Sequence, residues 1–108
     1  TPRLIDGDAL ADAINSIRDY NVPLISIMHT EVTAVDTCLD VVEGTWPGPV
    51  GVYAHSGDYV EDSWIFKNII SPNDYATVAD RWLERGVQVI GGCCGLGPSH
   101  IRALSGLK

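Results

Sequence analysis

The sequence predicts an α/β fold in which three parallel strands alternate with helices. Short, continuously apolar segments alternate with segments of helical periodicity, and glycine or proline marks most of the boundaries between them. A helix between two successive strands produces a right-handed crossover and a parallel sheet. Because 45% of the 108 residues are hydrophobic, we expect a single domain over residues 1–108.

A helix and then a strand are predicted at the start of the chain. Leu10, Ile14 and Ile17 recur at helical spacing within residues 6–20. The apolar run VPLISIM, residues 22–28, is long enough for a strand that is buried on both faces.

A second helix is predicted over residues 30–44. Val35, Leu39 and Val42 share one face of this segment, and Gly44 is placed to end it.

The strand VGVYAH, residues 50–55, comes next, and a long loop is expected from Ser56 to Ile70. Loops of this length in compact domains are often functional. The loop carries acidic and aromatic side chains, namely Asp58, Tyr59, Glu61, Asp62 and Trp64.

The last third of the chain begins with the clearest helix signal. Ser71, Pro72 and Asp74 provide an N-cap, a first-turn proline and a capping box, and Gly86 is placed to end the helix. The remaining segments are a strand (residues 87–90), a glycine turn (91–97) and a helix opened by Pro98 (98–107). Three strands are less than half of a closed (β/α)₈ barrel, which needs eight strands and roughly 250 residues.

Composition excludes some classes of partner. The net charge is -7 and lysine and arginine form no cluster, so we expect no nucleic-acid partner. No apolar run approaches the ~20 residues of a membrane span, and the first residues lack signal-peptide character. Three cysteines, an odd number with Cys38 far from the other two, favour a reducing, cytoplasmic compartment.

Cysteine and histidine side chains follow the predicted strands. Cys93 and Cys94 follow the third strand, while His29 and His55 end the first and second. The carboxyl ends of parallel strands lie side by side, and cysteine and histidine suit zinc, whose catalytic sites have three protein ligands and one open position. Adjacent strand residues normally point to opposite faces, but the surrounding glycines relax this restriction. A metal chelate is therefore one interpretation.

Other interpretations remain open at this point. The cysteine pair could be small buried residues or a redox pair. The segment Gly95–Ser99, before a helix, could cradle a phosphate. His29 and His55, taken singly, are more often ordinary loop or core residues than ligands. Cys38 lies on or near the apolar face of its helix, where core packing is its expected role.

The segment VIGGCCGLGPSHIRAL resembles the C-terminal signature of the homocysteine S-methyltransferase family, a GGCCG turn followed by Pro-x-His-Ile. VGVYAHSGDY is similar to the family's Tyr-Pro-Asn-x-Gly strand and loop. Trp64 and the segment SPNDYATVADRWLERGVQ match the following stretch in order and spacing. The similarity covers essentially the whole chain.

The resemblance implies that the three βα units are the last strands of a (β/α)₈ (TIM) barrel, here truncated. It also implies a Zn²⁺ ion held by three cysteines, two of which match Cys93 and Cys94. In the family the metal coordinates homocysteine and lowers the pKa of its thiol. The resulting thiolate takes a methyl group from a methyl donor, which gives methionine.

This chain departs from the family pattern at two positions. His29 stands where the first zinc cysteine is expected, so the implied metal ligands are His29, Cys93 and Cys94, with one negative charge fewer and a less electron-rich bound sulfur. His55 replaces the family's asparagine and could add a ligand, a hydrogen bond or neither.

The family's N-terminal strands, which help to hold the amino and carboxylate groups of homocysteine, have no counterpart in these residues. Catalysis would then need a preceding region or another chain, including a second copy, to complete the barrel. The alternative is a non-catalytic α/β remnant or oligomerising module that binds zinc structurally or not at all.

Overall fold

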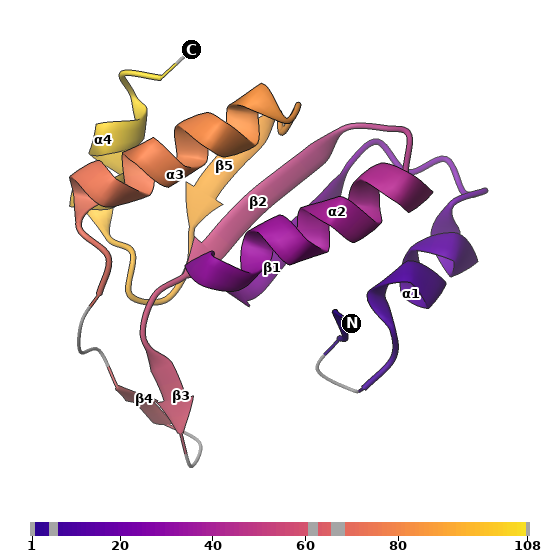
Figure 1. Cartoon of the computed structure of the whole chain (residues 1–108), viewed down its shortest axis with the longest axis horizontal. Coiled ribbons are helices and arrows are strands. Elements are labelled where there is room, and N and C mark those ends of the chain that lie inside the picture. The colour runs from indigo at the N-terminus through magenta and orange to yellow at the C-terminus, as the bar shows by residue number, and fades with distance from the viewer. Residues whose placement is uncertain (1, 5–6, 61–62, 66–68, 108) are drawn as a thin grey trace.

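A three-stranded parallel sheet in the order β1-β2-β5 forms the centre of the computed structural model, which describes residues 2–4, 7–60, 63–65 and 69–107 (Figure 1). This arrangement confirms the predicted α/β fold with parallel βα units. The strands of the sheet are β1 (Ile25–Glu31), β2 (Val50–His55) and β5 (Val89–Gly92). The helices are α1 (Leu10–Ile17), α2 (Val35–Thr45), α3 (Pro72–Glu84) and α4 (Pro98–Leu104), and a short 3₁₀ turn (Val32–Ala34) precedes α2.

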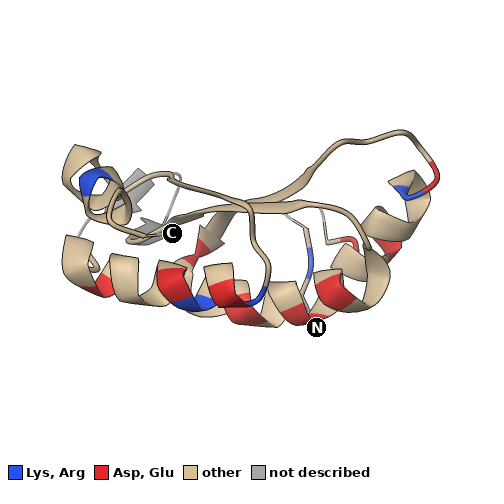
Figure 2. Ribbon diagram, turned by 90° about the horizontal axis from the view of Figure 1, so that it is seen from above, with Lys and Arg blue, Asp and Glu red and all other residues tan. Residues whose placement is uncertain are grey.

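The two faces of the sheet have different surroundings. Ile27 pairs with Val52, and both are buried in a core that includes residues of α2 and α3. These two helices lie along the same side of the sheet (Figure 2). On the alternate positions, Met28 and Val89 expose 45% and 53% of their surface. In a complete barrel, the face that carries these two residues would be the interior.

Helix α3 follows its predicted boundaries closely. The Ser71 hydroxyl accepts a hydrogen bond from the Asp74 N–H at 3.1 Å, and Pro72 is the first helical residue. Gly86, directly after the C-cap Arg85, has a φ of +97°. Glycine takes this left-handed conformation without strain, which explains why the helix ends there.

Several predicted element boundaries were wrong. Strand β1 ends at Glu31 rather than residue 28, β5 ends at Gly92 rather than residue 90, and α4 ends at Leu104 rather than residue 107.

Both ends of helix α2 also differ from the prediction. Helix α2 starts at Val35 rather than residue 30, because β1 continues to Glu31, which pairs with His55. Gly44 does not end α2: the Trp46 N–H donates to the Val42 carbonyl at 2.8 Å, so the helix closes one residue later. The following proline keeps Trp46 extended and prevents a further turn.

The expected long loop after β2 contains an antiparallel hairpin of β3 (Asp58–Val60) and β4 (Ser63–Ile65). Of the polar and aromatic residues singled out there, Asp58 and Tyr59 lie on β3 and Trp64 lies on β4. Glu61 and Asp62 lie outside the described residues.

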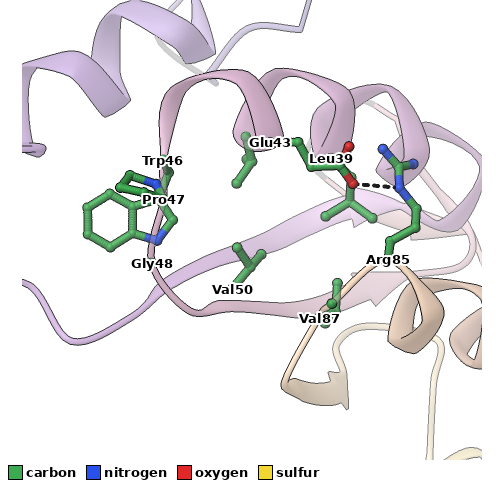
Figure 3. Close-up of a pocket in the computed structure, with 10 residues that line it drawn as sticks. Leu39, Glu43, Trp46, Pro47, Gly48, Val50, Arg85 and Val87 are labelled. Atoms are coloured by element: carbon green, nitrogen blue, oxygen red, sulfur yellow. Dashed lines mark hydrogen bonds and ion pairs between the residues drawn. The ribbon is translucent and has the colours of Figure 1, made fainter.

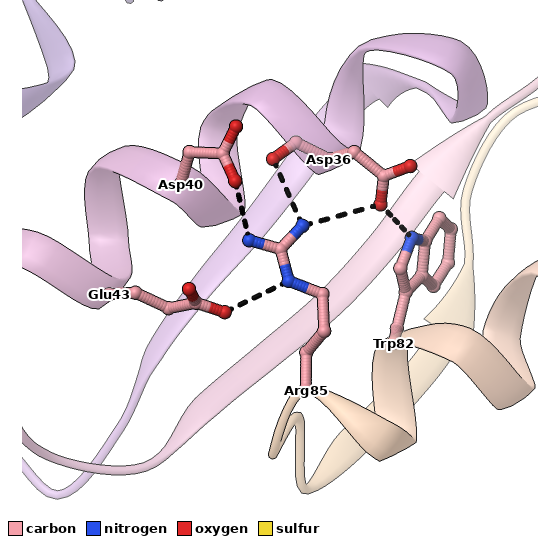
Figure 4. Close-up of polar contacts among 5 residues, drawn as sticks. All are labelled: Asp36, Asp40, Glu43, Trp82 and Arg85. Carbon is pink, nitrogen blue, oxygen red and sulfur yellow. Dashed lines mark hydrogen bonds and ion pairs between the residues drawn. The ribbon is translucent and has the colours of Figure 1, made fainter.

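An arginine at the end of α3 joins this helix to α2 (Figure 4). The Arg85 guanidinium donates to Glu43 at 2.9 Å, to Asp40 at 2.6 Å and to the carbonyl oxygen of Asp36 at 3.3 Å. The Asp36 carboxylate also accepts from the indole N–H of the buried Trp82 at 3.1 Å. Glu43 first, and Asp40 to a lesser degree, raise the already high pKa of Arg85. One cation therefore balances three carboxylates on the facing helix.

Replacement of this arginine tests the α2–α3 contact. We expect Arg85→Met to lower the free energy of unfolding in urea by about 1–2 kcal/mol, because it leaves the carboxylates facing one another without a cation. Arg81→Met, an exposed position on the same helix, is the matched control and should cost less than about 0.5 kcal/mol. Equal losses in the two variants would contradict the role of Arg85.

Candidate metal centre

The structure brings together the three side chains predicted as metal ligands. His29 lies near the end of β1, and Cys93 and Cys94 directly follow β5. The sulfur of Cys93 is 3.5 Å from Nδ1 of His29 and 3.9 Å from the sulfur of Cys94. One donor atom from each residue lies within 4.8 Å of the other two.

These separations fit one tetrahedral zinc ion. With Zn–S bonds of about 2.3 Å and Zn–N bonds of about 2.05 Å, tetrahedral angles place two sulfurs about 3.8 Å apart and a sulfur and a nitrogen about 3.6 Å apart. The observed Cys93–Cys94 and Cys93–His29 separations of 3.9 and 3.5 Å are close to both values. Three donors also leave a fourth position for a substrate atom. Two of the three donor pairs therefore match zinc geometry, and the third, His29 with Cys94, has its donor atoms within 4.8 Å.

A strand irregularity places His29 in this cluster. The β1–β2 register shifts between Met28 and Glu31, and His29 has a φ of +52°. The Thr30 hydroxyl donates to the Met28 carbonyl at 3.0 Å and closes the irregular turn. A bulge of this kind redirects a side chain, and histidine is among the few non-glycine residues enriched in the left-handed region.

Backbone hydrogen bonds to the end of β2 hold the cysteine turn. The Cys93 N–H donates to the Ala54 carbonyl at 2.9 Å, which extends the pairing of β2 with β5. The Ser56 N–H donates to the Cys94 carbonyl at 3.1 Å. Within the turn, the Leu96 N–H donates to the Cys93 carbonyl at 3.0 Å. Both cysteines are thus attached to the carboxyl end of the neighbouring strand.

The glycines around the cysteines act in different ways. Gly95 has a φ of +81° and gives the turn the left-handed residue it needs. Gly92 is required for space, because a Cβ there would stand 2.9 Å from the Cβ of Leu96. The sequence predicted that the flanking glycines are needed for unusual backbone angles. This reason holds for Gly95, whereas Gly92 is needed because a side chain there would collide with Leu96.

Partial burial, followed by the neighbouring sulfur of Cys93, raises the pKa of the Cys94 thiol. Two adjacent thiolates repel each other, so the uncharged form of Cys94 is favoured when no cation is near. A bound divalent cation reverses this preference and holds a coordinating thiol deprotonated. The pair can therefore take up a metal with release of protons.

The other histidine and cysteine residues have separate roles. Nε2 of His55 lies 3.5 Å from Oε2 of Glu31, so His55 pairs with the end of β1 and is not one of the three clustered donors. Glu31 was missed from the sequence, although it occupies the register position opposite His55. Cys38 packs against the core as expected, and burial raises the pKa of its thiol.

The glycine segment Gly95–Ser99 has little capacity left for a phosphate. The Gly97 N–H, at the N-terminus of α4, already donates to Nδ1 of His100 at 3.1 Å. The donor that a phosphate would use first is therefore occupied by a side chain of the same helix.

Two hollows differ in their relation to the cluster. A shallow groove of about 460 Å³ includes His29 and Glu31 in its lining. A cavity of about 270 Å³ near Trp46 and Arg85 lies at the other end of the sheet, where β2 begins (Figure 3). In parallel α/β proteins, ligands bind at the carboxyl ends of the strands. The groove beside His29 lies at that end, and of the three clustered residues only His29 lines it. No helix in the described part of the chain is both long and apolar enough to cross a lipid bilayer.

A His-Cys-Cys donor cluster at the carboxyl ends of parallel strands defines a candidate metal centre in an α/β protein. The family model described as homocysteine S-methyltransferase matches residues 1–107. The chain therefore belongs to the homocysteine S-methyltransferase family, as its cysteine turn predicted.

Curated relatives carry related names. The chain is 26% identical over 105 residues to "Homocysteine S-methyltransferase 2" of Arabidopsis thaliana. This match covers 94% of this chain and 32% of the relative. It is 32% identical over 106 residues to "Homocysteine S-methyltransferase 2" of Zea mays, with 94% and 31% covered. Over 59 residues it is 30% identical to "Selenocysteine Se-methyltransferase" of Brassica oleracea var. italica, with 52% and 17% covered. The chain spans about a third of the length of the first two.

Tyr75 provides a pH test of the support beneath the cysteine turn. Its hydroxyl donates to the Gly91 carbonyl at 2.5 Å, and burial raises the pKa of Tyr75 to about 12 from its ordinary value near 10. The unfolded chain therefore ionises first, and the contribution of Tyr75 to stability is complete below pH ~10 and is lost as the pH rises through about 12. Tyr75→Phe should abolish a decrease on the order of 2 kcal/mol between these pH values, measured by urea unfolding. Identical pH profiles for the two proteins would contradict it.

Proposed function

We propose that this chain provides the zinc-binding part of a homocysteine S-methyltransferase, with His29, Cys93 and Cys94 as the protein ligands of Zn²⁺. The single observation that carries the proposal is the approach of three suitable donor atoms to within 4.8 Å of one another. Membership of the homocysteine S-methyltransferase family supplies the reaction class.

The ligand set determines the charge of the centre. Zinc, when bound, supplies Lewis acidity that holds a coordinated thiol as the thiolate near neutral pH. Cys93 and Cys94 each contribute one negative charge and His29 contributes none. Three protein ligands leave the fourth position for the sulfur of homocysteine. Held as a thiolate, the sulfur of homocysteine would form a bond to the methyl carbon as the bond from this carbon to the donor breaks, giving methionine and the demethylated donor.

Relatives with related names suggest the range of substrates. The names of these relatives specify homocysteine in one case and selenocysteine in the other. Both are amino acids, and their side chains carry a thiol and a selenol respectively. A thiol or selenol of an amino acid is therefore the proposed methyl acceptor. Recognition of its amino and carboxylate groups, and of the methyl donor, is assigned to regions beyond these residues.

Completion of the barrel forms part of the proposal. The face that carries Met28 and Val89 is exposed in this chain, and the outer edges of β1 and β5 have no strand neighbour within the described residues. Additional βα units, from the same polypeptide, a different chain or a second copy, would cover both. All three cysteines are free thiols, which supports the proposed cytoplasmic location.

The replacement of a cysteine ligand by His29 favours a second candidate function. A neutral imidazole leaves a bound sulfur less electron-rich than a third thiolate would. A domain that binds zinc structurally, without catalysis, agrees with this change. Methionine formation separates the two candidates, because only the enzyme produces it.

Metal analysis tests the ligands. Protein purified without added zinc should contain about one zinc per chain by inductively coupled plasma mass spectrometry, because its ligand set matches a mononuclear site. The double variant Cys93→Ser with Cys94→Ser should lose nearly all of it. Cys38→Ser, which removes a thiol outside the cluster, is the control and should keep it. Zinc near zero in the unmodified protein, or unchanged in the double variant, would rule out this centre.

Restoration of a cysteine at position 29 tests the effect of the imidazole. In Co²⁺-loaded protein, His29→Cys should raise the thiolate-to-metal charge-transfer absorbance by roughly half, in proportion to three rather than two thiolates. In the complete protein, the same change should increase methionine formation from homocysteine and a panel of methyl donors. An unchanged absorbance, together with an unchanged zinc content in His29→Ala, would show that position 29 does not ligate the metal. Methionine formation by neither protein would leave the structural zinc domain as the better candidate.

A further inference from the structure

His100, in the first turn of α4, uses both ring nitrogens in hydrogen bonds that do not involve the metal cluster. Nδ1 accepts from the Gly97 N–H at 3.1 Å, and Nε2 lies 2.6 Å from the carbonyl oxygen of Ile70. A carbonyl oxygen only accepts, so Nε2 must carry the proton, and Nδ1 keeps its lone pair for Gly97. The neutral Nε2–H tautomer satisfies both contacts at once.

These two bonds close a ring of contacts around the cysteine turn. Besides accepting from His100, Ile70 donates its N–H to the hydroxyl of Ser56 at 2.9 Å. Ser56, only 4% exposed, donates its own N–H to the Cys94 carbonyl at 3.1 Å. The path therefore runs from Cys94 through Ser56 and Ile70 to His100, and then through Gly97 back along the chain to Cys94.

Tyr75 limits the orientation of the imidazole. The two rings meet edge to face, with centroids 6.2 Å apart and planes at 71°. The hydroxyl of Tyr75 is itself held by the Gly91 carbonyl on β5. The His100 ring is therefore placed by the same strand that leads into the cysteine pair.

We propose that His100 is a positioning residue for the metal centre. Its side chain joins the cysteine turn to the segment before α3 through a hydrogen bond to the Ile70 carbonyl. This role rests on the proposed zinc site. The Gly97 contact alone would be an ordinary capping-box contact, in which the side chain at the third helical position accepts from the N-cap N–H. The Ile70 contact reaches a segment 30 residues away in the sequence and sets the position of the turn that carries both sulfurs.

Three substitutions separate the two contacts. In His100→Asn, the amide oxygen replaces Nδ1 and keeps the Gly97 bond. In His100→Gln, the longer amide places an N–H near the position of Nε2 and keeps the Ile70 bond. His100→Ala removes both bonds. Arg85→Met, which weakens the α2–α3 contact away from the cluster, is the control for a general loss of stability.

The measurement is the Zn²⁺ dissociation constant, obtained by competition with a chromophoric chelator on folded protein. His100→Ala and His100→Asn should bind Zn²⁺ about 10-fold more weakly than the unmodified chain, the lower end of the loss for a direct outer partner of a metal ligand, because His100 acts on Cys94 through Ile70 and Ser56. His100→Gln should recover most of the affinity, and Arg85→Met should not lose it. Unchanged affinity in His100→Ala, or recovery by asparagine but not glutamine, would overturn the proposal.

Hydrogen exchange provides a readout without metal. In the metal-free chain, the hydrogen-bonded amides of Cys93 and Leu96 should exchange about 10-fold faster in His100→Asn than in His100→Gln, because only glutamine retains the Ile70 contact. Equal exchange in these two variants would overturn the positioning role even if His100→Ala does not fold. A chain that binds no Zn²⁺ but shows this difference would refute the proposed zinc site and leave the contact between His100 and Ile70 in place.

Discussion

The parallel register between β2 and β5 is the constraint on which the candidate metal centre depends. Tyr53 pairs with Gly91 and Ala54 with Gly92, and the Cys93 N–H continues this series by donating to the Ala54 carbonyl. A slip of one residue would turn every side chain of the shifted strand to the opposite face of the sheet. It would place Cys93 on the helix-covered side, away from the imidazole on β1. The pairing of two strands therefore decides whether the ligands meet at all.

The two ends of the sheet have separate tasks. At the amino ends of the strands, the cavity near Trp46 borders Arg85, which also balances the carboxylates of α2. At the carboxyl ends, a backbone bulge, two thiols and an imidazole are gathered in a small volume. In barrels of this kind, the first end is associated with stability and the second with chemistry. The residue types at the two ends of this short sheet follow the same division.

Local signals explain what could be predicted from the sequence. The N-cap Ser71, the apolar face of α2 and the stop at Gly86 depend on residues within a few positions, and all three are confirmed. The family motif also placed the three candidate ligands, which the structure brings together. The bulge at His29 and the pairing of Glu31 with His55 depend on contacts across the sheet. No local pattern contains that information, and the same is true of the contact between His100 and Ile70.

The left-handed backbone of His29 restricts the ligands that can evolve at this position. A φ of +52° disfavours β-branched side chains and is tolerated by glycine, asparagine, aspartate and histidine. Two of these four, histidine and aspartate, are also common zinc ligands. The backbone conformation thus limits substitutions at this position to a small set of residues, half of which can bind a metal. A change to cysteine would need the bulge to relax as well, so ligand identity and strand geometry at this position are expected to evolve together.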